Sequence, residues 1–232
     1  FMWLGYKGDP EMPPATRALT ALGPAYIKLG QVLSTRPDVV GNELAVQLRV
    51  LQDKLPPFSI EEAKVEVERE LGMPVDQIFS EFSEPVAAAS IAQVHRARVA
   101  ATGEDVAVKV LRPGIERAFG KDVDAFYLAA RIMEICAPGA RRLRPIEVIE
   151  HFDGVVQGEL DLRLESSAAS EFAANTVNDE GFQLPKIKWE YSARRVMTLG
   201  WADGAPMGDI DAIEDAGHNR ALLGDRVLQL FL

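Results

Sequence analysis

Apolar residues recur every three or four positions in the first part of the chain, between residues 17 and 33. This spacing is that of an α-helix with one buried face. Gly23 and Pro24 interrupt the pattern, and proline is favoured in the first turn of a helix. The segment is therefore predicted to form two helices, or one kinked helix. The positions that carry the pattern are Leu19, Leu22, Tyr26, Leu29 and Leu33.

Two further helices are predicted before residue 72. Residues 42–51 form a short amphipathic stretch that ends ahead of Pro56 and Pro57. Ser59, followed three residues later by Glu62, resembles a capping box and is expected to open a helix over residues 60–71. About the first third of the chain is thus expected to be helical.

A β-hairpin pattern replaces the helical one between residues 85 and 111. Residues 91–99 and 105–111 are rich in Val and Ala, with a turn signal at residues 101–104. Helical patterns resume over residues 115–137 and about 145–175. A last strand pair is expected at 183–188 and 194–199, and a final helix from about Asn219. This order predicts an α+β protein with a small antiparallel sheet.

The composition is that of a globular protein. The 232 residues are 47% hydrophobic and 26% charged, enough for one core or two small ones. A net charge of −10 argues against nucleic acid as a partner, because a phosphate backbone attracts clustered Lys and Arg. Cys136 is the single cysteine, so no intrachain disulfide can form, and a reducing compartment is expected. No apolar run of about 18 residues or leader pattern occurs in the sequence.

A lysine interrupts an apolar strand pattern at residues 106–110, Val-Ala-Val-Lys-Val. Because side chains alternate along a strand, Val106, Val108 and Val110 share one face and Lys109 lies on the other. An unpaired buried ammonium is costly, so Lys109 requires an acidic partner or an anionic ligand. An edge-strand lysine whose ammonium reaches water is an equally good interpretation of this segment.

Small residues precede the hairpin. Ala87, Ala88, Ala89 and Ser90 stand where a phosphate-covering loop would use glycine. Alanine avoids positive φ, so such a loop would be stiffer and would hold a nucleotide differently. Taken alone, these residues favour a site of close packing instead.

An acidic cluster, Glu159-Leu-Asp161-Leu-Arg-Leu-Glu165, lies in the helix predicted over residues 145–175. At i, i+4 spacing, Asp161 and Glu165 would share one helical face and repel each other by about 0.2–0.5 kcal/mol unless a cation lies between them. A solvated acidic face is the ordinary explanation. Lys109 favours a functional one, because phosphoryl-transfer folds pair a strand lysine with a helix glutamate.

A fourth segment lies on the early helices. Lys28 and Gln31 are spaced i, i+3, and such a pair is commonly just exposed to solvent. Gly30 between them costs about 1 kcal/mol in a helix interior, which indicates that something packs closely there.

Together the four segments resemble the UbiB/ABC1/ADCK family of atypical kinase-like proteins. Residues 28–38 are similar to the family's KxGQ motif and residues 87–95 to its alanine-rich loop. Residues 106–110 resemble its nucleotide-binding lysine strand, and residues 159–161 its ExD motif. The motifs occur in the family's order, and the resemblance covers essentially the whole chain.

The resemblance implies a protein-kinase-like α+β fold in three parts. A helical KxGQ extension would occupy residues 1–80 and a kinase-like N-lobe residues 81–200. The hinge and the start of a truncated C-lobe would occupy residues 201–232. Residues 197–203 would lead into the hinge, whose backbone would meet adenine.

The same resemblance implies roles for individual residues. Nucleotide would be bound by Lys109, by its helix partner Glu165 and by Ala87, Ala88, Ala89 and Ser90. The KxGQ site would comprise Lys28, Gly30 and Gln31, and the ExD site Glu159 and Asp161. ATP with Mg²⁺ is the expected cofactor, and no metal ligand is assigned.

Catalytic residues are not found in the chain. The family's His-x-Asp-x-His-Pro-Gly-Asn stretch, which would supply the catalytic Asp and the metal ligands, is absent from the sequence. The chain begins at Phe1 and ends within an apolar helical pattern, so we expect a fragment whose catalytic residues lie downstream of Leu232. Whether the chain acts as an enzyme is left open.

The function implied by the resemblance is support of ubiquinone (coenzyme Q) biosynthesis by an ATP-binding kinase or ATPase. Its partners would be nucleotide, ubiquinone-biosynthesis proteins and lipid quinone intermediates. A cytoplasmic protein peripheral to the bacterial inner membrane is expected. The alternatives are a non-catalytic pseudokinase scaffold and a lipid-binding module of a membrane-associated biosynthetic complex.

Overall fold

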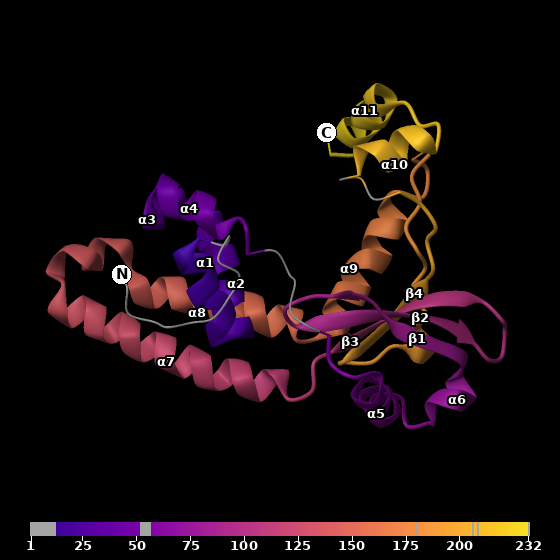
Figure 1. Cartoon of the computed structure of the whole chain (residues 1–232), viewed down its shortest axis with the longest axis horizontal. Coiled ribbons are helices and arrows are strands. Elements are labelled where there is room, and N and C mark those ends of the chain that lie inside the picture. The colour runs from indigo at the N-terminus through magenta and orange to yellow at the C-terminus, as the bar shows by residue number, and fades with distance from the viewer. Residues whose placement is uncertain (1–12, 52–56, 180, 206, 208, 232) are drawn as a thin grey trace.

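The N-terminal part of the chain is a small helical assembly (Figure 1). The computed structural model describes residues 13–51, 57–179, 181–205, 207 and 209–231. Gly23, at φ 117°, separates the first two helices, which confirms the predicted break. Ile27, Leu48 and Leu51 form the buried centre of this assembly. Its helices are α1 (Pro14–Leu22), α2 (Pro24–Ser34), α3 (Pro37–Val40) and α4 (Asn42–Leu48).

A four-stranded antiparallel sheet forms the second part, with the strands in sequence order. The predicted hairpin is confirmed as β2 and β3. A further strand, β1, extends the hairpin and was not predicted from the sequence. Its alternating pattern is interrupted because β1 contains Pro85 and shifts register against β2 at several points. Of the last predicted pair, only the second segment is a strand, since residues 183–188 contribute an isolated bridge at Ile187. The strands are β1 (Phe79–Ala88), β2 (Ala92–Val99), β3 (Asp105–Leu111) and β4 (Val196–Gly200).

One face of the sheet is covered by α5 (Ile60–Leu71) and α6 (Val75–Ile78), which lie below it in Figure 1. The predicted capping box at Ser59 and Glu62 is present. Valines of α5 and of β3 share one buried cluster on this face. The three-part division with a boundary at residue 80 stays a prediction, but α5 packs with the sheet and β1 begins at Phe79.

A long helical hairpin extends away from one end of the sheet (Figure 1). It consists of α7 (Ile115–Cys136), the 3₁₀ turn η1 (Pro138–Leu143) and α8 (Pro145–Glu159). Three phenylalanines, Phe119, Phe126 and Phe152, are buried between the two long helices. The same cluster includes Ala25 of α2 and Leu111 of β3, so it joins the helical part to the sheet.

The helix predicted over residues 145–175 is broken. It ends at Glu159, and α9 (Leu162–Asn175) starts with Asp161 as its N-cap in an extended conformation. The backbone turns here because the N–H of Leu162 donates to the carbonyl of Arg194, 2.8 Å away, rather than continuing α8. The prediction that Asp161 and Glu165 share one helical face is therefore wrong.

Two helices complete the chain, α10 (Ile210–Asp215) and α11 (Arg220–Phe231), and the second confirms the helix predicted from about Asn219. Within the described part of the chain, no helix is both long enough and apolar enough to cross a membrane. The observed architecture confirms the predicted α+β class.

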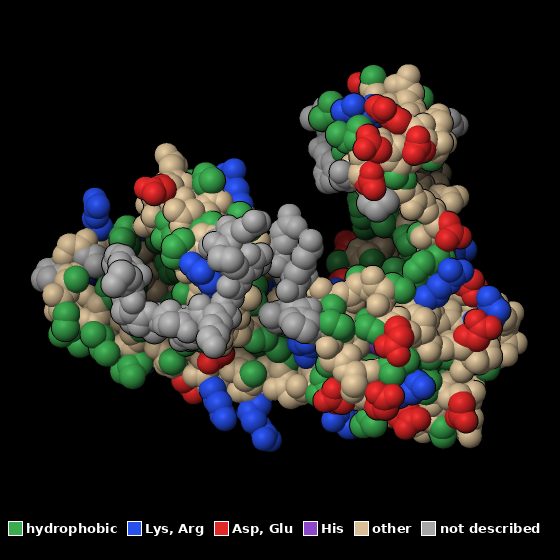
Figure 2. Space-filling view, viewed as in Figure 1, with side chains coloured by type: hydrophobic (Ala, Val, Ile, Leu, Met, Phe, Trp, Pro, Cys, Tyr) green, Lys and Arg blue, Asp and Glu red, His purple; other side chains and the backbone are tan. Residues whose placement is uncertain are grey.

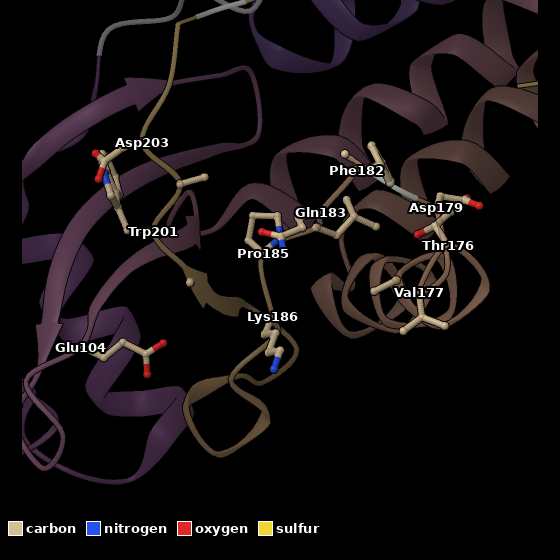
Figure 3. A pocket seen from close by; sticks show the side chains of 15 residues that line it. Glu104, Thr176, Val177, Asp179, Phe182, Gln183, Pro185, Lys186, Trp201 and Asp203 are labelled. Carbon is tan, nitrogen blue, oxygen red and sulfur yellow. The ribbon is translucent and has the colours of Figure 1, made fainter. Parts of the chain in front are cut away.

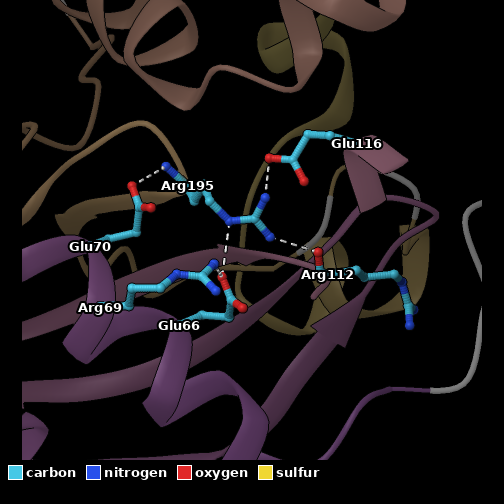
Figure 4. Close-up of polar contacts among 6 residues, drawn as sticks. All are labelled: Glu66, Arg69, Glu70, Arg112, Glu116 and Arg195. Atoms are coloured by element: carbon cyan, nitrogen blue, oxygen red, sulfur yellow. Dashed lines mark hydrogen bonds and ion pairs between the residues drawn. The ribbon is translucent and has the colours of Figure 1, made fainter. Parts of the chain in front are cut away.

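A buried ionic cluster holds the sheet, α5 and α7 together around Arg195, the residue just before β4 (Figure 4). The Arg195 guanidinium donates to Glu66 of α5 at 2.9 Å and pairs with Glu116 of α7. It also donates to the carbonyl of Arg112 at 2.9 Å, while the Arg195 backbone N–H donates to Glu70 at 3.1 Å. Burial alone would lower the pKa of Arg195, but the two carboxylates raise it, so the cluster is held by charge.

Replacing Arg195 by Met is expected to destabilise the protein by about 3 kcal/mol or more, because the buried Glu66 loses a charged partner. Urea unfolding would measure the loss. Arg220→Met is the matched control, since Arg220 forms an exposed pair with Glu214, and should cost less than about 0.5 kcal/mol. A loss below about 1 kcal/mol for Arg195→Met would contradict the role given to this cluster.

A second buried polar chain runs through β2. His95 is fully buried and stacks on the ring of Phe82. Its Nδ1 lies 2.8 Å from the carbonyl of Ser83 and its Nε2 lies 2.9 Å from the amide nitrogen of Gln93. Gln93 in turn bonds both backbone groups of Phe58, ahead of α5. Because the amide nitrogen can only donate, His95 is neutral with its proton on Nδ1.

The protein should lose stability as the pH falls below about 6.5, the ordinary pKa of histidine. Burial lowers the pKa of His95 in the folded state, so the unfolded chain binds a proton that the folded protein does not. The loss can reach about 1.4 kcal/mol per pH unit until the folded pKa is passed. Urea unfolding between pH 7.5 and 5.5 would show this slope, which should be reduced in His95→Gln but kept in His151→Gln, because His151 is exposed. Equal slopes in both variants would refute the assignment.

Candidate functional site

Lys109 and Glu165 form the centre of the candidate site. The ammonium of Lys109 lies 2.7 Å from each carboxylate oxygen of Glu165. Lys109 lies on the face of β3 opposite the buried valines 106, 108 and 110, as the strand pattern predicted. The lysine therefore has an acidic partner on α9 and does not simply reach water.

The exposure of this pair indicates what it can do. The side chains of Lys109 and Glu165 are 26% and 48% exposed, and ion pairs of this kind contribute only about 0–1 kcal/mol to stability. An ammonium has three N–H donors, and Glu165 takes two of them. The arrangement is suited to holding a lysine donor ready for an anion. Phosphate binding by Lys109 stays a prediction.

The alanine-rich loop is shorter than the sequence suggested. Ala87 and Ala88 are the last residues of β1, paired with Val94 and Gln93 of β2. Ala89, Ser90 and Ile91 make the connection, and the Ala89 N–H donates to the carbonyl of Ala92 at 2.8 Å. The result is a tight, closed turn with Ser90 buried.

The KxGQ residues make contacts with different parts of the protein. Lys28 of α2 reaches the last residue of α8, with its ammonium 2.6 Å from a carboxylate oxygen of Glu159. Gln31 donates its amide to the carbonyl of Leu51 at 3.0 Å and so ties α2 to the segment after α4. Gly30 is buried, and an added Cβ would lie 2.9 Å from Leu19 and closer still to Leu51. The close packing predicted at Gly30 is confirmed.

The ExD residues are not one cluster with Glu165. Glu159 ends α8 and pairs with Lys28, whereas Asp161 caps α9 and forms an ion pair with Arg163 at 2.6 Å. The Arg163 guanidinium lowers the pKa of Asp161 below its ordinary value. Among the residues that the structure describes, no three His, Cys, Asp or Glu side chains are grouped to hold a metal ion.

A cavity of about 1070 Å³ lies beyond the end of β4, and Figure 3 shows its walls. Trp201 and Asp203 lie on one side, and Thr176, Val177 and Phe182 on the other. The segment predicted to lead into the hinge thus runs along β4 and then lines this cavity. Lys109, Glu165 and the alanine-rich loop do not line it, so the cavity and the ion pair are separate features.

The sequence did not point to Arg112 and Arg195, whose contacts support the elements that carry the candidate site. Arg195 left a weak signal, since a charged residue directly precedes the apolar strand segment at 196–199. Nothing in the spacing of Arg112 marks its contact with the loop, which joins residues 23 positions apart.

Comparison with known proteins assigns the family. Residues 50–232 match the ABC1 atypical kinase-like domain. A "Probable protein kinase UbiB" of Marinobacter nauticus is 40% identical over 215 residues, 92% of this chain and 39% of that protein. One of Azotobacter vinelandii is 39% identical over 233 residues, 99% of this chain and 43% of that protein. The chain spans about two fifths of the length of these curated relatives. With its kinase-like α+β fold, this chain belongs to the ABC1 family of atypical kinase-like proteins.

Proposed function

We propose that the chain forms the nucleotide-binding lobe of an ATP-dependent atypical kinase that supports ubiquinone biosynthesis. The observation that carries the proposal is the half-exposed pair of Lys109 and Glu165 beside a closed turn of small residues. A strand lysine held by a helix glutamate is the arrangement with which kinases bind nucleotide phosphates. The role in ubiquinone biosynthesis rests on the UbiB name of the relatives.

The cofactor in this proposal is ATP with Mg²⁺. Glu159 and Asp161 are the carboxylates that would meet the metal ion, because they lie at the junction of α8 with the helix that carries Glu165. Both are already paired, Glu159 with Lys28 and Asp161 with Arg163. A metal ion would therefore have to compete with Lys28 and Arg163 for these carboxylates.

The substrate in this proposal is a small molecule or a lipid quinone intermediate rather than a protein. Lys28 attaches α2 to the end of α8, next to the start of α9, and so holds the helical extension close to the candidate site. The resemblance to the family implies that this extension occupies the place where a protein substrate would bind. Association with ubiquinone-biosynthesis proteins at the cytoplasmic face of the inner membrane completes the proposal.

Nucleotide should stabilise the full-length gene product against heat in the presence of Mg²⁺. A ligand at 100 times its Kd adds about 2.7 kcal/mol to the free energy of unfolding. Lys109→Ala should remove this stabilisation, because it removes the donor that faces the phosphates. The measurement is the shift in Tm with a non-hydrolysable ATP analogue.

The matched control for Lys109→Ala is Lys121→Ala, an exposed lysine of α7 that lies outside the site. It should keep the full shift in Tm. If the wild-type protein shows no shift, or if Lys109→Ala keeps it, the nucleotide site proposed here does not exist.

Asp161 offers a test of the metal ion that is separate from folding. Asp161→Asn keeps a good N-cap and should cost less than about 0.5 kcal/mol, while Asp161→Ala should cost about 1 kcal/mol. Both should weaken the Mg²⁺-dependent part of nucleotide stabilisation, because both remove the charge. Unfolding in urea and Tm shifts with and without Mg²⁺ would measure the two effects. A full Mg²⁺ effect in Asp161→Asn would exclude Asp161 as a ligand.

A non-catalytic scaffold is a second candidate function, favoured by apolar side chains on the surface. Val46 of α4 and Val50 just after it are 58% and 50% exposed, and Leu128, Ile132 and Ile135 are exposed along α7. Figure 2 shows hydrophobic side chains along the outer edge of that helix. A partner that covers these surfaces, without any effect of nucleotide on stability, would favour the scaffold.

A further inference from the structure

The backbone of Arg112, the first residue after β3, is held in place by two hydrogen bonds. Its N–H donates to the carbonyl of Ile91 at 2.9 Å, and its carbonyl accepts from the guanidinium of Arg195 at 2.9 Å. Figure 4 shows the Arg112 carbonyl facing Arg195 while the Arg112 side chain extends away. The side chain therefore leaves from a point that the buried ionic cluster holds in place.

The guanidinium of Arg112 reaches the alanine-rich loop. Its Nε and Nη2 donate to the carbonyl of Ala89 at 3.2 and 3.0 Å. The N–H of Ala89 is also committed, to the carbonyl of Ala92. Both backbone groups of Ala89 are thus bonded within the protein, one of them to a charged donor, and such bonds are stronger than bonds between neutral groups.

Arg112 approaches the loop from the side away from Lys109. Its guanidinium lies over the ring of Phe58, 5.6 Å from the ring centre. Phe58 packs against the cluster that contains Val108 and Val110, on the opposite face of β3 from Lys109. The guanidinium is therefore placed to hold the loop and not to touch phosphates bound beside Lys109.

We propose that Arg112 is a positioning residue that holds the alanine-rich loop at a fixed place relative to Lys109 and thereby raises the affinity for nucleotide. This inference rests on the proposed nucleotide site. A loop that is already ordered loses less conformational entropy when a ligand binds than a mobile loop does. Arg112 is suited to this because the same strand, β3, carries Lys109 and leads directly into Arg112.

The test compares Arg112→Met, Arg112→Lys and the control Arg117→Met in the full-length gene product. Methionine keeps an apolar stem over Phe58 and removes the donors. Lysine keeps a positive charge and N–H donors but loses the planar guanidinium that donates through two nitrogens. Arg117 is exposed on α7. The Kd for a non-hydrolysable ATP analogue is measured by calorimetry, and exchange of the Ala89 amide hydrogen is measured without nucleotide.

Arg112→Met is expected to raise the Kd about tenfold, roughly the cost of ordering the backbone of one residue, and to speed Ala89 exchange by a similar factor. Arg112→Lys should lie between it and the wild type, and Arg117→Met should match the wild type. The Tm without nucleotide shows whether Arg112→Met folds, and if it does not, Arg112→Lys against the wild type decides the question.

An unchanged or lower Kd in the Arg112 variants overturns the inference, whatever the exchange rate of Ala89. Faster exchange with unchanged Kd would leave Arg112 as a purely structural residue. Loss of binding in Lys109→Ala combined with wild-type binding in Arg112→Met would overturn this inference alone. A wild-type protein that binds no nucleotide would overturn both proposals together.

Discussion

The burial of the charged Arg195 side chain is the constraint on which the rest of the structure depends. A buried guanidinium must be surrounded by acceptors, and these come from three elements that are far apart in sequence: α5, the first turn of α7 and the end of β3. The neighbouring residue Arg194 supplies the carbonyl that redirects the chain at Leu162. The position of α9, and hence of Glu165, therefore follows from how the chain enters β4.

The two ionic features of the lobe differ in what they contribute. The Arg195 cluster is buried and connects elements, so its loss would leave carboxylates without compensation. The pair of Lys109 and Glu165 is half-exposed, and water weakens its attraction. The pair contributes little to stability, but it fixes the position of the Lys109 ammonium in the candidate site. The rigid Arg195 cluster and the accessible Lys109 ammonium are complementary, since a positioned donor requires a rigid support.

Local chemistry made much of the fold predictable. The capping box at Ser59, the break at Gly23 and the alternating hairpin around Lys109 each depend on residues that are neighbours in sequence. Long-range bonds decided what was missed. Asp161 is a favoured N-cap residue, but the break there depends on a hydrogen bond from the Leu162 N–H to the carbonyl of Arg194, 32 residues further along the chain. The bulges of β1 blurred its pattern in the same way.

The candidate site was predictable as a set of residues but not as a set of contacts. Glu165 was named as the partner of Lys109 from the resemblance to the family, and the two side chains do form an ion pair. The separation of Asp161 from Glu165 and the support of Ala89 by Arg112 were not predictable, since both depend on how distant segments meet. An argument from i, i+4 spacing requires a continuous helix, but tertiary contacts end α8 at Glu159, before Asp161.

The polar groups described around the site already have partners within the protein. Lys109 has Glu165, Lys28 has Glu159, Asp161 has Arg163 and Ala89 has Arg112. An incoming nucleotide would exchange protein contacts for its own, rather than simply replacing water. If nucleotide binds as proposed, its affinity would be a small difference between two well-satisfied states, and small changes in loop order or helix position could decide it. A site built in this way is sensitive to how the helical extension and the sheet are held, which makes the supporting residues as important as those that face the ligand.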